Sequence, residues 1–223
     1  MKYKVLFIHR SVGENLIKDG KIYQKLKNNP SVDFNDYNVN TKILRTKNDS
    51  KKLLLDFPNN NTTPKDYSIL FNKNTNYQNT TDYILSFNTV IIKSCYPNSN
   101  IKSNQELAKI KDYYTQITSF FNNLPNKFII ITSPPLVPLK TNPQNANRAR
   151  DLSNWLSNSN FGDNISTFNL FDHLAESDGK NANMLKKQYR RLLPFDSHPN
   201  KYANQQVAKR FIECVIDDTI LST

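Results

Sequence analysis

Residues 5–13 read VLFIHRSVG, and the fold class can be argued outward from this stretch. Residues 5–8 are apolar without interruption, which is typical of a parallel strand buried on both faces. The run stops at His9, Arg10 and Ser11, and apolar residues then recur at helical spacing up to position 27. That spacing predicts a helix over 14–27. The chain therefore starts as a strand, a tight turn and a helix.

The same alternation of strand and helix continues to the end of the chain. Apolar runs predict strands at 89–93, 128–132 and 165–170, with weaker strand-like pieces at 32–34 and 39–44. Helical spacing of apolar residues predicts helices near 107–124, 147–156 and 200–220. We expect the Asn- and Pro-containing residues 57–79 to form an excursion over the surface.

This alternation predicts an α/β fold, in which a parallel sheet of about five strands lies between two layers of helices. The expected plan is a three-layer α/β/α, flavodoxin-like arrangement. A length of 223 residues suits one domain over 1–223.

The charge and the cysteine count narrow the class of protein. The formal net charge is +11, but Lys and Arg are scattered over the whole length and no nucleic-acid motif appears, so we expect no nucleic-acid partner. Two cysteines form no disulfide framework and no metal-ligand spacing. The apolar run at 5–8 is too short for a signal peptide or a membrane span. We therefore expect a cytoplasmic protein.

Polar residues that follow the predicted strands should meet at one edge of the sheet, where α/β proteins bind their ligands. The first strand leads to Ser11, the strand at 89–93 leads to 94–100, and the turn before the last helix carries 196–200 (DSHPN). A serine nucleophile needs a base within hydrogen-bond reach, and the base needs a third group to orient it. Ser11, His198 and Asp196 are residues of the right types for these roles.

Four segments resemble blocks of the SGNH (GDSL-like) hydrolases. Residues 5–13 are similar to the nucleophile block, in which a serine follows the first strand, and 196–200 are similar to the last block, in which Asp and His precede the final helix. Residues 91–98 stand where that family carries its oxyanion asparagine, and 130–135 (IITSPP) resemble the next strand and its Pro-rich exit. The order and spacing match over nearly the whole chain.

The resemblance implies a serine hydrolase of oxygen esters. Ser11 would attack the carbonyl, His198 would take its proton, and Asn98 or Asn100 with the Ser11 N–H would hold the oxyanion. The resemblance implies no metal and no other cofactor. A small-molecule or glycan ester is the expected substrate class, and a carbohydrate O-deacetylase is the first interpretation. The sequence does not define an oligomeric state.

The sequence also departs from the family pattern. His9-Arg10-Ser11 replaces Gly-Asp-Ser, and no glycine lies between Gly20 and Gly162 to supply a second oxyanion N–H. Asp196 stands two residues before His198 rather than three. A Ser–His dyad oriented by a backbone carbonyl therefore remains an alternative to a triad. A catalytically silent domain that binds a glycan or protein partner, or an O-acyltransferase, are the alternative functions.

Further residues near Ser11 are candidate substrate contacts. His9 lies two positions before the serine, on the same side of an extended strand, so we expect it at the mouth of the site. Arg10, Gly13 and Tyr96 are also expected to line the site. A zinc site built from His9, His198 and Asp196 is not expected, because its spacing follows no known ligand pattern.

Overall fold

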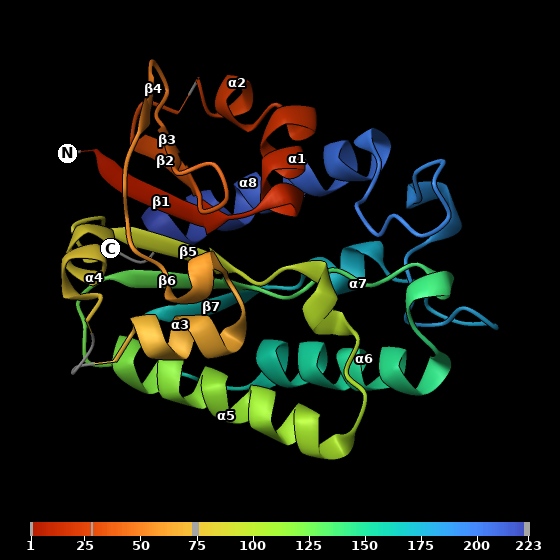
Figure 1. The fold of residues 1–223 in the computed structure, drawn as a ribbon. Helices are drawn as coiled ribbons and strands as arrows, with labels where there is room; N and C mark the ends of the chain where they lie inside the picture. The colour runs from red at the N-terminus through yellow and green to blue at the C-terminus, as the bar shows by residue number, and fades with distance from the viewer. Residues whose placement is uncertain (1, 28, 73–75, 221–223) are drawn as a thin grey trace.

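A seven-stranded sheet forms the centre of the molecule in the computed structural model, which describes residues 2–27, 29–72 and 76–220 (Figure 1). The strand order is β4-β3-β2-β1-β5-β6-β7. Five strands run parallel, namely β1 (Tyr3–His9), β2 (Val32–Asn38), β5 (Thr89–Lys93), β6 (Lys127–Ile131) and β7 (Ile165–Phe168). Short β3 (Ile43–Arg45) and β4 (Ser50–Lys52) extend the β2 edge as antiparallel strands. The predicted fold class is confirmed, with two more strands than expected.

Helices cover both faces of the sheet (Figure 1). One face carries α1 (Ser11–Gly20), α2 (Ile22–Leu26) and α8 (Lys201–Ile220), and the other carries α3 (Pro64–Leu70), α4 (Gln78–Leu85), α5 (Asn104–Phe121) and α6 (Pro143–Asn158). The short helix α7 (Leu170–Leu174) directly follows β7. None of these described helices is long and apolar enough to cross a membrane.

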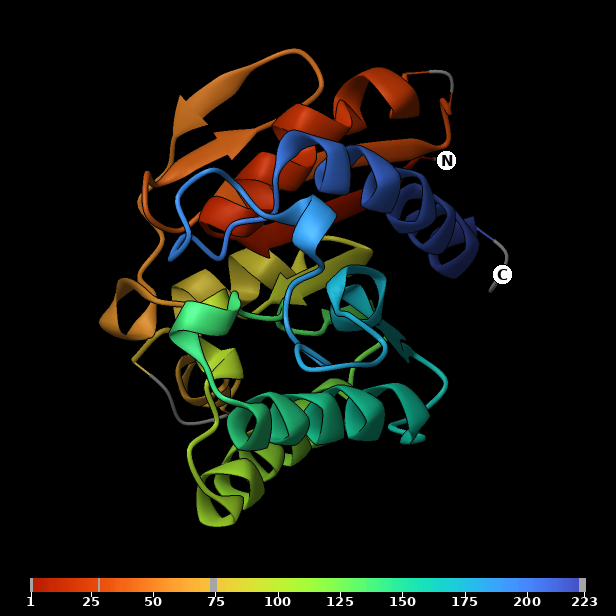
Figure 2. The ribbon, with the colours of Figure 1, turned by 90° about the vertical axis from the view of Figure 1, so that its right-hand side faces the viewer.

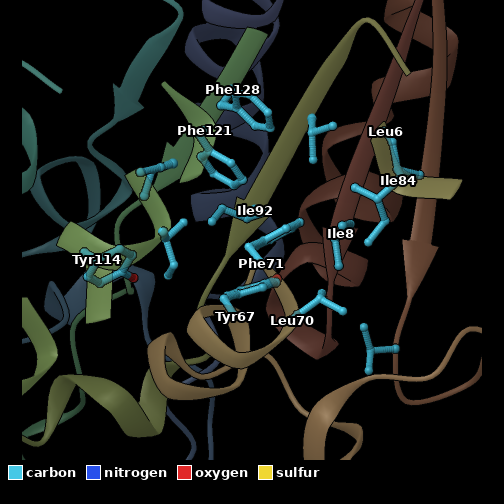
Figure 3. Packing of buried hydrophobic residues seen from close by; sticks show 14 of the residues in the cluster. Leu6, Ile8, Tyr67, Leu70, Phe71, Ile84, Ile92, Tyr114, Phe121 and Phe128 are labelled. Carbon is cyan, nitrogen blue, oxygen red and sulfur yellow. The ribbon is translucent and has the colours of Figure 1, made fainter. Parts of the chain in front are cut away.

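The central strand β1 is buried on both faces, as its unbroken apolar run predicts. Leu6 and Ile8 pack towards α3 and α5, whereas Val5 and Phe7 pack towards α1 and α8. Figure 3 shows the first of these clusters, in which Phe121 of α5 stacks on Phe128 of β6 with 3.7 Å between ring centroids. Both faces of β1 are covered from Val5 to His9, and the chain returns towards the surface at Arg10 and Ser11, which follow the strand.

Two helix predictions require correction. The helix expected over 14–27 starts at Ser11 and is divided, because Lys21 takes a left-handed conformation (φ 53°) that ends α1 and precedes α2. The surface excursion expected over 57–79 contains the helices η1 (Pro58–Asn60) and α3, and α3 belongs to the core. Residues 73–75 of that prediction lie outside the described residues.

Local sequence signals explain why α3 forms. Thr63 and Asp66 make a capping box at its first turn, in which each side chain accepts from the other residue's backbone N–H. Pro64 occupies the first helical position, where a missing N–H costs nothing. Tyr67 and Leu70 then point into the core shown in Figure 3, so the burial of two large side chains holds the helix on the sheet.

Candidate active site

Three segments distant in sequence meet at the carboxyl edge of the sheet. Ser11 is the first residue of α1 and follows β1 after one intervening residue. Tyr96 opens the short helix η2 (Tyr96–Ser99) beyond β5, and the loop that carries Asp196 and His198 leads into α8. Helix α8 lies beside α1 on the same face of the sheet (Figure 2), which brings that loop to Ser11.

A continuous chain of hydrogen bonds connects Ser11, His198 and Asp196. The Ser11 hydroxyl lies 2.8 Å from His198 Nε2, and His198 Nδ1 lies 2.6 Å from Asp196 Oδ1. Since an ionised carboxylate only accepts, Nδ1 carries the hydrogen and Nε2 is left to accept from the serine. This is the tautomer that a general base needs before it takes the serine proton.

A tight turn explains how Asp196 reaches a histidine only two residues away. The backbone N–H of His198 donates to Asp196 Oδ1 at 2.9 Å, and the ring donates to the same oxygen. One carboxylate oxygen thus fixes both the backbone and the ring of His198. A carboxylate therefore holds the His198 ring, and not a backbone carbonyl as in the dyad alternative.

The charge of Asp196 is stabilised by its surroundings. Burial raises the pKa of this carboxyl, but the backbone and ring hydrogen bonds from His198 and the nearby Arg191 guanidinium lower it by more, so the net pKa lies below its ordinary value of 3.8. Arg191 Nη1 lies 3.6 Å from Asp196 Oδ2. Asp196 is therefore ionised at neutral pH, as a group that orients an imidazole must be.

Tyr96 packs against the imidazole ring of His198. Its ring meets the His198 ring edge to face, with 4.9 Å between centroids and an interplanar angle of 78°. Burial raises the pKa of the Tyr96 phenol, so the hydroxyl keeps its proton and can donate a hydrogen bond. Tyr96 thus restricts the movement of the imidazole and presents a donor near it.

Arg10 connects the start of α1 to two surface loops. Its Nε donates to Asn40 Oδ1 at 2.5 Å, and its Nη1 donates to Asn61 Oδ1. Arg10 is the N-cap residue of α1, and no side-chain hydrogen bond caps this helix. The first N–H groups of a helix have no acceptor within the helix, so the N–H of Ser11 is free to bind an anionic oxygen.

The two asparagines expected to bind the oxyanion have local partners. The Asn98 amide donates to the Cys95 carbonyl at 3.1 Å and closes its own turn. Asn100 Oδ1 accepts from the Asn145 amide at 2.9 Å and connects η2 to α6. Their contact with substrate stays a prediction.

The expectation for His9 and Gly13 is wrong in its geometry. The His9 side chain is fully buried and lies 2.8 Å from Asp36, so it does not reach the mouth of the site. Gly13 faces His9, and a β-carbon at position 13 would lie 2.3 Å from His9 Cβ. Gly13 is therefore required by the close approach of α1 to the His9 ring, and the alternation argument failed because the ring turns under the helix.

Charged residues surround His9, and the sequence-based predictions did not include them. His9, Glu14 and Asp36 have ligand-type atoms within 4.8 Å of one another, and Arg45 bonds both carboxylates. The zinc set of His9, His198 and Asp196 is not formed, since each histidine pairs with a different aspartate. The available signal was Asp36, an acidic residue just after the strand-like piece at 32–34 and part of the buried strand β2.

The loop that carries Asp196 and His198 also exposes apolar side chains. Leu192, Leu193 and Phe195 of this loop are exposed, as is Leu139 in η3 (Pro138–Lys140). Lys140 Nζ lies 6.0 Å from the centre of the Phe195 ring, which places η3 beside the loop. Apolar side chains are thus offered to solvent near the hydrogen-bonded residues.

Comparison with known proteins identifies the fold. No protein-family model matches the sequence, and neither does a curated protein. A Bacteroides fragilis protein assigned as an acylhydrolase has a similar structure, with a TM-score of 0.56 and 13% identity over 97% of this chain and 91% of that chain. A GDSL-like lipase from Bacteroides thetaiotaomicron has a TM-score of 0.53 and 12% identity, with 95% and 88% covered. An acetyl xylan esterase has a TM-score of 0.51 and 16% identity, with 96% and 100% covered.

These likenesses extend over almost the full length of each chain. They confirm that the chain has the fold of GDSL-like hydrolases, as the resemblance in sequence implied. Since sequence identity does not exceed 16% in these three pairs, they establish the fold and leave the activity to be argued from the site.

Proposed function

We propose that the protein is a serine hydrolase that cleaves an oxygen ester, with Ser11 as nucleophile, His198 as general base and Asp196 as the residue that orients the base. The observation that carries this proposal is the hydrogen-bonded order Ser11–His198–Asp196, with distances of 2.8 and 2.6 Å. A helix cap or a packing contact needs no such order, whereas nucleophilic catalysis needs both hydrogen bonds at once.

The reaction proceeds through an acyl-enzyme. As Ser11 Oγ attacks the ester carbonyl, its proton moves to His198 Nε2, and the ionised Asp196 stabilises the imidazolium that forms. The N–H of Ser11, at the positive end of α1, stabilises the oxyanion, and Asn98 is the proposed second donor. His198 then protonates the leaving alcohol. Water, deprotonated by the same histidine, attacks the acyl-enzyme and frees Ser11.

The proposed substrate is a small-molecule or glycan ester, with a short acyl group such as acetate. The fold-level likeness to an acetyl xylan esterase supports a carbohydrate ester. Arg10 and Tyr96 are the proposed substrate contacts beside Ser11, since both offer hydrogen-bond donors there.

A fluorophosphonate probe tests the proposal, because it labels only an activated serine. We expect the label on Ser11, identified by mass spectrometry of the digested protein, and hydrolysis of p-nitrophenyl acetate by the same preparation. Ser11→Ala should abolish both, while Ser157→Ala, which changes an exposed serine of α6, should change neither.

Three results would contradict the proposal. Unchanged turnover in Ser11→Ala would exclude Ser11 as nucleophile. An unlabelled Ser11 in folded protein would instead support the catalytically silent binding domain. Acyl transfer to an added sugar alcohol, faster than hydrolysis, would reassign the same serine to an O-acyltransferase.

A further inference from the structure

A second histidine–aspartate pair lies directly behind the proposed nucleophile. His9 is the last residue of β1, and Asp36 lies on the neighbouring strand β2 (Figure 1). Both side chains are fully buried, and His9 Nε2 lies 2.8 Å from Asp36 Oδ2. The proposed catalytic steps do not use this pair, although His9 is only two residues from Ser11 in sequence.

The second ring nitrogen of His9 contacts the backbone next to Ser11. His9 Nδ1 lies 2.9 Å from the carbonyl oxygen of Arg10. A carbonyl oxygen only accepts, so Nδ1 carries a hydrogen. Asp36 also only accepts, because its pKa lies below the ordinary value: burial raises it, and the bonds from His9, Arg45 and Tyr23 lower it more. Both ring nitrogens of His9 therefore face hydrogen-bond acceptors.

Asp36 is held by further partners besides His9. Arg45 Nη2 lies 2.7 Å from Asp36 Oδ2 and 2.6 Å from Glu14 Oε2, so one guanidinium faces two carboxylates. Lys18 Nζ lies 2.9 Å from Glu14 Oε1 and is the second cation of the group. Tyr23 donates to Asp36 Oδ1 at 2.5 Å without adding charge. The group is therefore an ion-pair network, which fixes the carboxylate that holds the His9 ring.

The contact with Arg10 bears on the N–H of Ser11. The Arg10 carbonyl and the Ser11 N–H belong to one planar trans peptide and point in opposite directions. The carbonyl accepts from His9 below and from the Glu14 N–H at 2.9 Å. The carbonyl is held along α1 and against the His9 ring, so the N–H of Ser11 points the opposite way, out of the first turn of the helix. A donor on a carbonyl also polarises the peptide, which strengthens its N–H as a donor.

We propose that His9 is a positioning residue for the oxyanion site. Its ring, held by Asp36, fixes and polarises the Arg10–Ser11 peptide, whose N–H binds the oxyanion. The catalytic part of this inference rests on the proposed function, whereas the positioning of the peptide does not. Gly13 is required by the same arrangement, because only a residue without a side chain lets the ring lie under α1.

Two conservative substitutions separate the two hydrogen bonds of His9. Asparagine can place its amide nitrogen where Nδ1 lies, so His9→Asn keeps the donor to Arg10 and loses the contact with Asp36. Glutamine can place its amide nitrogen where Nε2 lies, so His9→Gln keeps the contact with Asp36 and loses the donor to Arg10. The pair therefore distinguishes positioning of the peptide from support of the buried carboxylate.

Steady-state kinetics and thermal melting of both variants give the first test. If His9 positions the oxyanion donor, His9→Gln should lower kcat by about 10²-fold with KM nearly unchanged, and His9→Asn by about tenfold. Melting temperatures should follow the opposite order. His9→Asn should be the less stable variant, because the buried Asp36 then loses its hydrogen bond from position 9. If kcat and melting temperature rank the variants in the same order, His9 is only structural and the inference is overturned.

Nuclear magnetic resonance gives a test that does not depend on activity. The carbonyl carbon of Arg10 and the amide nitrogen of Ser11 should keep their shifts in His9→Asn and move in His9→Gln. Unchanged shifts in His9→Gln would overturn the inference even in an active esterase. The expected shifts in a protein without esterase activity would reject the proposed function and leave the positioning intact.

Discussion

Two histidine–aspartate pairs contact the segment Arg10–Ser11, one at the Arg10 carbonyl and the other at the Ser11 hydroxyl, and their surroundings differ. His198 and Asp196 are two residues apart on a loop, are partly exposed and lie 2.6 Å from each other. His9 and Asp36 come from adjacent strands, are fully buried and lie 2.8 Å apart. The free nitrogen of His198 faces a hydroxyl that can give up a proton, whereas that of His9 faces a carbonyl that can only accept.

This difference shows that the third partner determines what the pair can do. A ring between a carboxylate and a hydroxyl can cycle between neutral and charged forms, as a general base must. A ring between a carboxylate and a carbonyl has two acceptors and no proton to receive, so its function is to hold the backbone. Partial exposure of the first pair permits the ring to meet substrate, and full burial of the second keeps its geometry constant.

The largest effect should come from loss of the general base. His198→Ala should lower kcat for p-nitrophenyl acetate on the order of 10⁴-fold, since the serine is then without a proton acceptor. The double variant Ser11→Ala/His198→Ala should be no worse than either single variant, because serine and base act as a unit. Losses that multiply in the double variant would show that the two residues act separately.

The next effect should come from the acid of the exposed pair. Asp196→Asn replaces an acceptor by an amide that cannot stabilise the imidazolium, and kcat should fall by about 10³-fold. The melting temperature should change little, because the loop is partly exposed. Turnover within tenfold of wild type would mean that the protein uses a Ser–His dyad and that Asp196 only shapes the turn before α8.

Loss of the buried acid should affect stability more than its exposed counterpart does. Asp36→Asn removes the carboxylate that bonds both His9 and Arg45 and leaves Arg45 with Glu14 as its remaining carboxylate partner, so the free energy of unfolding at pH 7 should fall by about 3 kcal/mol. The folded-state pKa of Asp36 is depressed below 3.8, so its contribution is complete above roughly pH 5 and is lost as the pH falls through the lower folded value.

Denaturant unfolding at pH 7 and pH 3 measures this dependence. The wild type should lose stability between these pH values, and Asp36→Asn should lose less, because the titrating group is gone. An Asp36→Asn protein as stable as wild type at pH 7 would place the buried pair outside the groups that hold the fold.

The smallest effect should come from Arg191, which lies beside Asp196 of the exposed pair. Arg191 lies 3.6 Å from Asp196 and is about one-third exposed, so Arg191→Gln should cost less than about 1 kcal/mol and change kcat by less than about threefold. Arg45→Gln is the matched control in the buried pair and should destabilise by more, since it removes bonds to both Asp36 and Glu14. Equal melting temperatures of the two variants would remove the distinction between the pairs.

The exposed pair could be predicted from the sequence, whereas the buried pair could not. Asp196 and His198 are neighbours in one short segment, and Ser11 directly follows an unmistakable apolar strand, so local patterns predicted all three. His9 and Asp36 meet only through the pairing of β1 with β2, in which His9 lies opposite Asn38 and Phe7 opposite Asp36. Strand pairing and the direction of a side chain under a helix have no local pattern.

The fold shows the same division. Strands with continuous apolar runs were predicted well, because burial on both faces permits few other sequences. Helix α3 was missed since Pro64 and its asparagine-rich approach were interpreted as loop, although Thr63 and Asp66 provide a helix-start signal. The break at Lys21 was also missed, because hydrophobic spacing continues through it and only the backbone angle changes.

The separation of nucleophile and base along the chain has a consequence for protein synthesis. Ser11 leaves the ribosome before its hydrogen-bond partner His198, which follows 187 residues later. A nascent chain, or one truncated before His198, therefore holds a serine with no base. Domains fold largely as units during synthesis, and α8 must dock beside α1 before the loop reaches Ser11. Reactivity of the serine thus appears only after the segment that carries His198 has been made and α8 has docked beside α1.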